Sequence, residues 1–322
     1  MSTFSSILSN GVVSNLGVYP ASDGGIQELV TQSAYVPSVR EDGRGLVLNQ
    51  VSTEEFVKKI AFDFERFALS SRESFLVAVS EKEEFGSLGW PLLKFYYASF
   101  FAAHAIMRSR GAGIIKLDRS HVDHLNDIAS IYELAPPSLT PGMYAFKRTP
   151  AASNSAGELS LVIYPDTAGS GVHEGFWLNF CRFLDDEAAN SVEKGEIDSA
   201  SFVALSSELR EAVTRGPNSG GVWLSAIRNQ INYQHKYDTW LPYRRSSEGY
   251  KALDNVLQTF LPSGRLDVSK TRKPVESFLN VTCYVSTLAF DVCEMIAKTS
   301  TRGGAFGQKW RRINGLLGPH AD

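Results

Sequence analysis

An arginine, an asparagine and a histidine recur at helical spacing in the stretch Arg228–Tyr237, which reads RNQINYQHKY. On an α-helix at about 100° per residue, Arg228 and His235 differ by roughly 20° around the axis, and Asn232 lies about 40° from Arg228. A guanidinium can bind a phosphate through two parallel hydrogen bonds, and an imidazole can exchange a proton at neutral pH. Together they could hold an RNA phosphate, help to activate the ribose 2′-hydroxyl and protonate the leaving oxygen, without a metal. The same spacing also occurs by chance on polar helix faces.

A clear loop precedes the helix that would carry this stretch. Residues 215–221 contain three glycines, a proline, an asparagine and a serine, which are residues that favour turns. The apolar lead-in 222–224 follows, and Pro242 is incompatible with a helix interior. We therefore expect a helix that starts near Val222, carries Arg228–Tyr237 and stops by Pro242.

Two long helices are predicted further upstream. The first starts at Ser52 or Thr53, where a hydroxyl and two glutamates suit a helix N-terminus. Apolar residues then recur every three to four positions to about Val79. The second covers Trp90–Arg108 and is apolar on all sides, as expected for the central helix of a bundle. Helical patterns return at the segments 176–184, 202–213 and 275–298, so the predicted fold class is mainly α.

Shorter segments complete the expected architecture. The segments 144–147 and 159–164 predict a small β-hairpin, inserted between helices at about residues 137–170. Residues 1–50 show no sustained period and predict an irregular N-terminal arm, with a short helix near residues 25–32. We therefore divide the chain into the arm 1–50, a helical domain 51–300 that contains the insertion, and a basic C-terminal tail 301–322.

Charge is unevenly distributed along the sequence. The 322 residues carry a formal net charge of −3 at pH 7, which argues against a protein that coats nucleic acid through general basicity. Between residues 264 and 312, however, nine basic residues accompany only four acidic ones, and this excess could form a phosphate-binding surface. Arg272 and Lys273, together with Asn232, are our candidates for substrate binding. A solvated C-terminal face explains the same charges equally well.

Cysteine and hydropathy patterns predict a cytoplasmic protein that does not enter a membrane. Cys181, Cys283 and Cys293 contain no CxxC pair, as expected for reduced, buried thiols. No basic and apolar leader is evident at the N-terminus, and no apolar run approaches the ~20 residues that span a bilayer. His121 and His124 are three residues apart but lack a third ligand at a diagnostic distance, so we predict no metal site.

Two parts of the sequence together resemble one known family. The stretch 228–237, with Arg-Asn followed by His and then Tyr, resembles the R-polar-x(n)-H motif of the HEPN superfamily (higher eukaryote and prokaryote nucleotide-binding). The helix Trp90–Arg108, which contains Tyr-Tyr-Ala at positions 96–98, resembles the inner helix of those proteins. The two parts occur in the expected chain order. The resemblance covers about residues 51–298 and leaves the arm, the hairpin and the basic tail unexplained.

This resemblance implies a HEPN-like helical bundle that cleaves RNA as a metal-independent endoribonuclease and needs no cofactor. Arg228 and His235 would be the catalytic pair, and Asn229 would position them. Family members place two such motifs across a dimer interface, so one motif per chain implies a homodimer. Many members are toxins or antiviral effectors. Where the partner is a nucleotidyltransferase antitoxin, a tyrosine at the position of Tyr237 can be adenylylated.

Other readings of the same sequence remain open. Some family members lack nuclease activity, so the bundle could be a non-catalytic module for dimerisation, nucleotide binding or protein interaction, with the motif residues in a salt-bridged interface. The chain is much longer than a minimal HEPN domain, so its extra segments could gate activity or bind a sensor or antitoxin protein. Metal-dependent hydrolysis at His121 and His124 is the third and least favoured reading.

Overall fold

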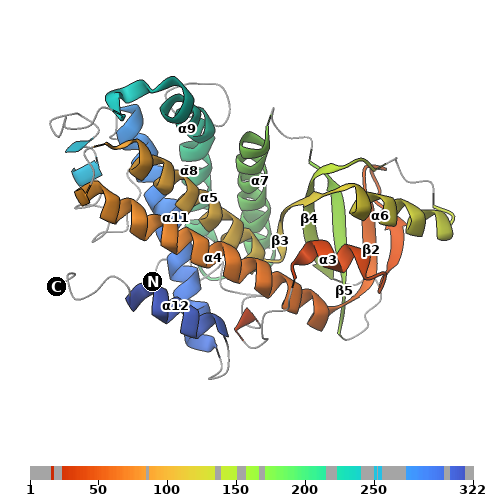
Figure 1. Cartoon of the computed structure of the whole chain (residues 1–322). Helices are drawn as coiled ribbons and strands as arrows, with labels where there is room; N and C mark the ends of the chain where they lie inside the picture. Colours follow the sequence, from red (N-terminus) through yellow and green to blue (C-terminus); the bar gives the residue numbers. More distant parts are fainter. Residues whose placement is uncertain are drawn as a thin grey trace.

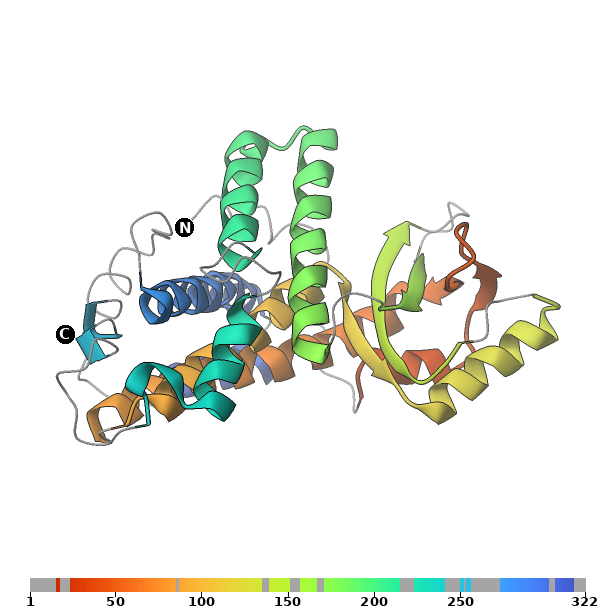
Figure 2. The ribbon, with the colours of Figure 1, turned by 90° about the horizontal axis from the view of Figure 1, so that it is seen from above.

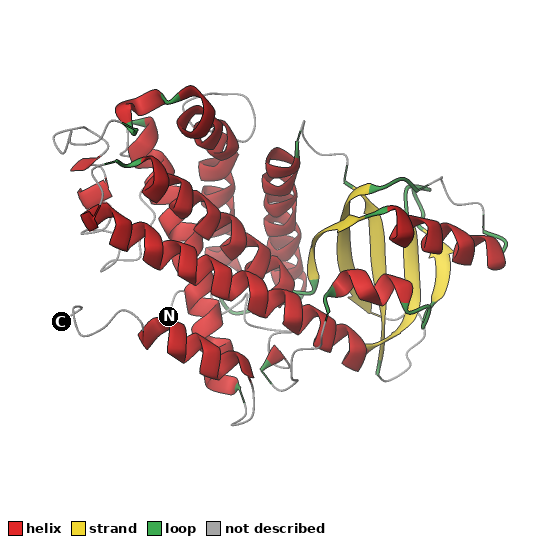
Figure 3. Cartoon of the chain, in the orientation of Figure 1, coloured by secondary structure: helices red, strands yellow, loops and turns green. Residues whose placement is uncertain are grey.

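The protein combines a group of packed helices with one antiparallel β-sheet, as the computed structural model in Figure 1 shows. The helices gather at one end of the molecule and the sheet forms the other end, while the long helix α4 reaches from one to the other (Figure 3). The mainly α fold class is confirmed. The structure describes the following residues: 16–17, 24–84, 87–134, 139–150, 157–166, 171–214, 223–240, 250–251, 253–255, 273–300 and 305–315.

Three long helices form the centre of the helical part. Helix α4 covers Thr53–Glu84 and starts with two glutamates, which suit the positive end of the helix dipole. Helix α5 covers Gly89–Ser109, carries Pro91 in its first turn and is buried on nearly all sides. Helix α11 covers Pro274–Thr299 and packs against both. The predictions for these three helices are confirmed. They were predictable because apolar residues recur regularly along each of them.

Shorter helices surround this centre. Helices α7 (Val172–Glu193) and α8 (Ser199–Thr214) form a pair that projects from the body in the view of Figure 2. Helix α9 (Trp223–Gln234) packs on α5 and is followed by the short 3₁₀ helix η1 (Lys236–Asp238). The remaining described helices are α3 (Ile26–Thr31), α6 (Arg119–Ile131) and α12 (Ala305–Gly315).

The sheet has five antiparallel strands in the order β1-β2-β5-β4-β3. Helices α3 and α6 lie against one side of the sheet (Figure 1). The hairpin predicted from the sequence is confirmed as β4 and β5, but it is the centre of this sheet rather than an isolated insertion. The strands are β1 (Val36–Val39), β2 (Leu46–Ser52), β3 (Ala112–Leu117), β4 (Gly142–Pro150) and β5 (Glu158–Pro165).

The N-terminal arm was predicted incorrectly over residues 36–50. This segment forms β1 and most of β2, and β2 pairs with β5 in a register that joins Leu48 to Leu161. Strand β1 has four residues and contains Pro37, so the local sequence gave little β signal. The partner of β2, strand β5, lies more than 100 residues away. The short helix expected near residues 25–32 is confirmed as α3.

The basic C-terminal tail is a helix over residues 305–315, which corrects the prediction of a plain tail there. Phe306 and Trp310 are buried, and the Phe306 ring meets Phe64 of α4 at 5.2 Å between ring centroids. Lys309 forms an ion pair with Glu65. At least one of the basic residues counted toward a phosphate-binding surface therefore already has an acidic partner within the chain.

Helix α11 has the length and composition of a membrane-crossing helix, and it is the one such helix among the described residues. Within its most apolar window, 67% is buried inside the fold, which is typical of the core helix of a soluble protein. Cys283 and Cys293 lie on this buried helix and Cys181 lies on α7, all three as free thiols. Burial raises the pKa of the Cys181 thiol to about 12, so it stays protonated and unreactive at neutral pH.

Candidate functional site

Helix α9 presents the predicted motif because its apolar side chains fix its orientation. Trp223, Leu224, Ile227 and Ile231 are buried at three-to-four spacing, and they face α5, α8 and α11. The indole N–H of Trp223 also donates a hydrogen bond of 2.6 Å to the carbonyl of Ala212 in α8. The polar residues of α9 are thereby left on its outer side.

Arg228 is held in place by two hydrogen bonds. Its Nη2 donates to the Tyr97 hydroxyl at 2.5 Å, and its Nη1 donates to the side-chain oxygen of Asn229 at 2.8 Å. The guanidinium carbon lies 5.6 Å from the ring centroids of Tyr97 and Tyr233. Burial acts to lower the pKa of Arg228, but the hydrogen bond to Tyr97 and the neighbouring tyrosines outweigh this effect and the pKa is raised. Asn229 was predicted to position both Arg228 and His235, and the structure shows its side chain in contact with Arg228.

The guanidinium of Arg228 still has donor capacity. A guanidinium carries five N–H donors, and the hydrogen bonds among the described residues use two of them. Its Nε is buried and has no hydrogen-bond partner there, while the residue as a whole is half-buried. Such a group can still donate to an oxyanion that approaches from solvent.

His235 does not share a helical stripe with Arg228, so that part of the prediction is wrong. Helix α9 ends at Gln234, and His235 adopts the left-handed conformation with φ 51° and ψ 32°. Its side chain is exposed, and its ring centroid lies 6.1 Å from that of Trp240. Arg228 is held on Tyr97 whereas His235 lies beside Trp240, so the two side chains have different neighbours in this structure.

The segment after His235 is kinked because it docks on the start of α5. The carbonyl of Thr239 accepts hydrogen bonds from the Leu88 and Gly89 backbone N–H groups at 2.8 and 2.9 Å, and from the Ser87 hydroxyl at 3.0 Å. The Trp240 indole packs so closely on Gly89 that a Cβ there would lie 2.5 Å from the ring. Sequence periodicity could not predict this early helix end, because it depends on contacts made about 150 residues away.

Three residues near the motif hold unusual backbone conformations. His235, Tyr237 and Asp238 have φ values of 51°, 67° and 52°, although non-glycine residues in this region cost about 1–3 kcal/mol each. Such strain persists only where surrounding contacts impose it, and it clusters at functional sites. The contacts of Thr239 and Trp240 supply that constraint.

Tyr237, the predicted modification site, is half-buried. Its hydroxyl donates a hydrogen bond to the side-chain oxygen of Gln230, and burial raises its pKa. The hydroxyl therefore faces α9 rather than open solvent. A modifying enzyme would have to break this hydrogen bond first.

The structure places a second histidine closer to Arg228 than the sequence suggested. His173, in the first turn of α7, has its Nδ1 3.1 Å from the Tyr96 hydroxyl, and its ring centroid is 6.0 Å from that of Tyr97. Burial, and then the charge of Arg228, lower the pKa of His173. Tyr96 accepts a hydrogen bond of 3.2 Å from the Trp177 indole, so its own O–H can donate to His173 Nδ1 and leave the imidazole proton on Nε2. No local motif indicated His173, because α7 and α9 are separate in the sequence and both pack on α5.

The other predicted residues contribute less to this arrangement. Asn232 is half-buried on α9. Lys273 precedes the first residue of α11, and Arg272 lies outside the described residues. His121 Nδ1 meets Asp118 at 2.6 Å and His124 meets the Ser33 hydroxyl at 2.9 Å. In the part of the chain that the structure describes, no three His, Cys, Asp or Glu side chains are grouped to hold a metal ion.

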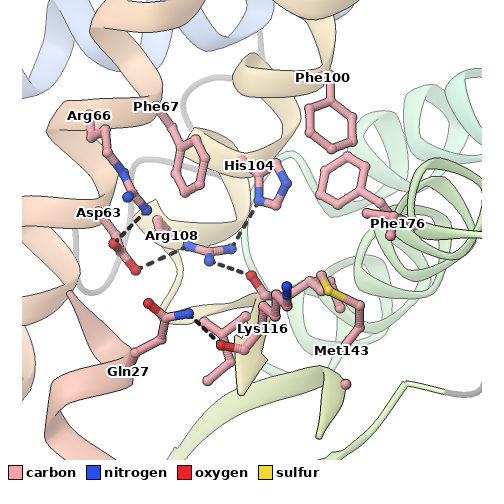
Figure 4. Close-up of a pocket in the computed structure, with 14 residues that line it drawn as sticks. Gln27, Asp63, Arg66, Phe67, Phe100, His104, Arg108, Lys116, Met143 and Phe176 are labelled. Carbon is pink, nitrogen blue, oxygen red and sulfur yellow. Dashed lines mark hydrogen bonds and ion pairs between the residues drawn. The ribbon is translucent and has the colours of Figure 1, made fainter. Parts of the chain in front are cut away.

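A second polar cluster, which the sequence did not reveal, lies where the helices meet the sheet. Asp63 of α4 and Arg108 of α5 are buried beside each other on the wall of a cavity of about 550 Å³ (Figure 4).

No family model, curated protein or solved structure matches this chain. Functional conclusions therefore depend on the geometry of the stretch 228–240 and of this cavity.

Proposed function

We propose that this protein is a metal-independent endoribonuclease of the HEPN type that acts as a homodimer. The observation that carries the proposal is the form of the stretch 228–240: a clamped arginine with spare donors on α9, followed by an exposed histidine in a strained turn. Resemblance to the R-polar-x(n)-H motif adds support. A role as a toxin or anti-phage effector is part of the same proposal, and it follows from that resemblance.

The chemistry requires a positive group at the phosphate and two proton transfers. The ribose 2′-hydroxyl loses its proton and attacks the adjacent phosphorus, the bond to the 5′-oxygen breaks, and that oxygen gains a proton. The products are a 2′,3′-cyclic phosphate and a 5′-hydroxyl. Arg228 would stabilise the charge that develops on the phosphoryl oxygens. One His235 would take the proton from the 2′-hydroxyl and return it to the 5′-oxygen.

A dimer could complete the site. Within one chain Arg228 is held on Tyr97 and His235 lies beside Trp240, and two copies that meet at this face could bring the arginine of one next to the histidine of the other. The face also carries two exposed aromatic side chains, Trp90 at 58% and Tyr233 at 70% exposure. Exposed aromatic rings at such a place suit either contact with a second copy or stacking of RNA bases.

One observation favours the non-catalytic alternative. The Arg228 guanidinium is already bonded to Tyr97 and Asn229 within the chain, so it could serve to hold α9 on α5. The bundle would then be a dimerisation or interaction module with an intact motif and no cleavage.

RNA cleavage by matched variants separates the two. Wild type is compared with Arg228→Ala, His235→Ala and the surface control His124→Ala, on total cellular RNA with a chelator present. We expect cleavage that survives the chelator and is unchanged in His124→Ala. It should fall at least 100-fold in Arg228→Ala, which loses the charge-stabilising group, and in His235→Ala, which loses the proton-transfer group. Intact RNA with wild type, or equal cleavage by all variants, would reject the nuclease.

The dimer and the identity of the histidine need their own measurements. Light scattering should give twice the monomer mass, and mixing Arg228→Ala with His235→Ala should restore part of the activity, because one composite site regains both groups. A strict monomer, or no restoration in the mixture, contradicts the composite site. Loss of cleavage in His173→Gln but not in His235→Ala would transfer the proton-transfer role to His173.

A further inference from the structure

The cavity between helices and sheet is built from six elements that are far apart in the sequence. It has a volume of about 550 Å³, which lies within the usual range of small-molecule sites. Helices α3, α4, α5 and α7 and the strands β3 and β4 contribute to its wall (Figure 4). Its polar and charged lining residues are Gln27, Asp63, Arg66, His104, Arg108 and Lys116.

One wall of the cavity is a stack of three flat rings. The His104 ring lies between Phe67, at 4.4 Å between centroids and 10° between planes, and Phe176, at 4.0 Å and 24°. Phe100 meets the edge of His104 at 4.8 Å. Burial, followed by the charges of nearby arginines, holds the pKa of His104 well below its usual value. This wall is therefore neutral, flat and rigid, which suits an aromatic or planar apolar group.

Beside this wall, two guanidinium groups share one carboxylate. Arg66 bonds Asp63 at 3.1 Å, whereas the Nε of Arg108 lies 3.8 Å from the other oxygen of Asp63 and has no hydrogen-bond partner among the described residues. The side chain of Arg108 is 1% exposed. Lys116 adds a further cation on the same cavity. The lining thus carries three positive charges and one negative charge.

The backbone leaves room for this charged cluster. A Cβ on Gly113 of β3 would lie 1.8 Å from Nη1 of Arg108, and a Cβ on Gly25 would lie 2.3 Å from Oδ1 of Asp63. Arg108 also donates to the carbonyl of Ile114 at 2.6 Å and contacts His104 Nδ1 at 3.2 Å, so its guanidinium cannot turn away. These bonds alone would suit a purely structural role for Arg108, in which it joins α5 to β3. Such a role would not require the cavity that adjoins Arg108.

We propose that this cavity binds a small molecule that joins an oxyanion to a flat apolar body. The oxyanion, a carboxylate or a phosphate monoester, would lie against Arg66 and Lys116 in the field of Arg108. The flat body would lie on the Phe67–His104–Phe176 stack. The net positive charge of the lining, the incomplete pairing of the buried Arg108 guanidinium among the described residues, and the adjoining aromatic wall together define this ligand class. The site does not depend on the proposed nuclease activity.

Titration calorimetry with two anion classes tests the site. The probes are 2-naphthoate and adenosine 5′-monophosphate, each paired with its uncharged counterpart, 2-naphthalenemethanol or adenosine. We expect at least one anion to bind with an affinity at least ten-fold above its neutral counterpart, and which one binds tells carboxylate from phosphate. The absence of binding by both anions at millimolar concentration would overturn the proposal, as would equal affinity for charged and neutral members.

Two pairs of matched variants place the binding in this cavity. Arg66→Gln removes a lining cation whose side chain is 55% exposed, and Arg119→Gln removes an exposed arginine elsewhere that also pairs with an aspartate on its own helix. Val172→Trp fills the cavity rim, and Val192→Trp enlarges an equally exposed valine of the same helix, since both are 57% exposed. We expect the first member of each pair to weaken binding at least ten-fold and the second to leave it unchanged. If both members of either pair behave alike, the anion binds elsewhere and the proposal fails.

Discussion

Arg108 belongs to α5 and Arg228 is hydrogen-bonded to Tyr97 of the same helix, yet the surroundings of the two arginines differ in almost every respect. Arg228 is half-buried and has N–H donors without a partner among the described residues, and its pKa is raised because Tyr97 accepts from it and tyrosines surround it. Arg108 is fully buried, and desolvation lowers its pKa to about 10. An arginine at the surface can bind and release a phosphate during a reaction, whereas a buried arginine with incomplete pairing suits a resident ligand. Under the two proposals, Arg228 would serve a reaction with turnover and Arg108 would serve a bound ligand.

Removing each arginine should give the largest contrast in stability. Arg108→Met leaves the Ile114 carbonyl and part of Asp63 without a partner, and breaking such a buried pair costs about 3–5 kcal/mol. Arg228→Met removes a half-exposed group and should cost about 1 kcal/mol. Urea unfolding followed by circular dichroism measures both. Equal free energies of unfolding for the two variants would contradict the contrast.

His104, which is buried beside Arg108, should make the free energy of unfolding depend on pH. The pKa of His104 is lowered well below its model-compound value of 6.5 in the folded protein, so the unfolded chain takes up a proton first as the pH falls below 6.5. Stability is then lost on acidification and regained as the pH rises, by at most about 1.4 kcal/mol per pH unit for one group.

The variant His104→Phe isolates this effect because it keeps a ring in the stack and removes the titrating group. Urea midpoints measured between pH 7.5 and pH 5.5 should fall less steeply for His104→Phe than for wild type. His124→Phe, which alters a half-buried histidine of α6 outside the ring stack, should retain the wild-type slope. A slope unchanged in His104→Phe would show that other groups account for the pH dependence.

A smaller change in stability is expected at His235, where a more stable variant should still be inactive. Glycine adopts the left-handed conformation of His235 without the strain that a Cβ introduces. His235→Gly should therefore unfold at a free energy about 1 kcal/mol above that of His235→Ala, while neither variant cleaves RNA. If His235→Gly is the less stable of the two, the observed turn is not the conformation in solution.

The sequence was informative where apolar period alone decides the structure. Helices α4, α5 and α11 follow from long runs of regularly spaced apolar residues, and the β4–β5 hairpin follows from two short apolar segments and the loop between them. Strand β3 was missed because Gly111 and Gly113 favour a helix end directly after the predicted helix Trp90–Arg108. Strand β2 was missed because its partner β5 lies more than 100 residues away, and β1 because it has only four residues and contains Pro37. The existence of a sheet therefore needed contacts that no single segment encodes.

The same limit applies to the two sites. The sequence pattern placed Arg228 and Asn229 on a helix, as observed. The position of His235 depends instead on the docking of Thr239 and Trp240 on α5. The cavity combines residues from Gln27 to Phe176, and each of them taken alone resembles an ordinary core or surface residue. The resemblance to the HEPN superfamily remains a prediction that the cleavage experiment tests.

The docking of the strained turn has a spectroscopic consequence. Trp240 meets Trp90 edge to face, with ring centroids 5.3 Å apart and planes at 88°. Two indoles this close and this steeply inclined couple their electronic transitions, so the pair should produce an exciton signal in circular dichroism. Trp240→Phe would remove that signal while retaining an aromatic ring. The protein thereby carries its own optical label beside His235, and release of the turn by RNA, by a partner or by a second copy could be followed in solution without added dye.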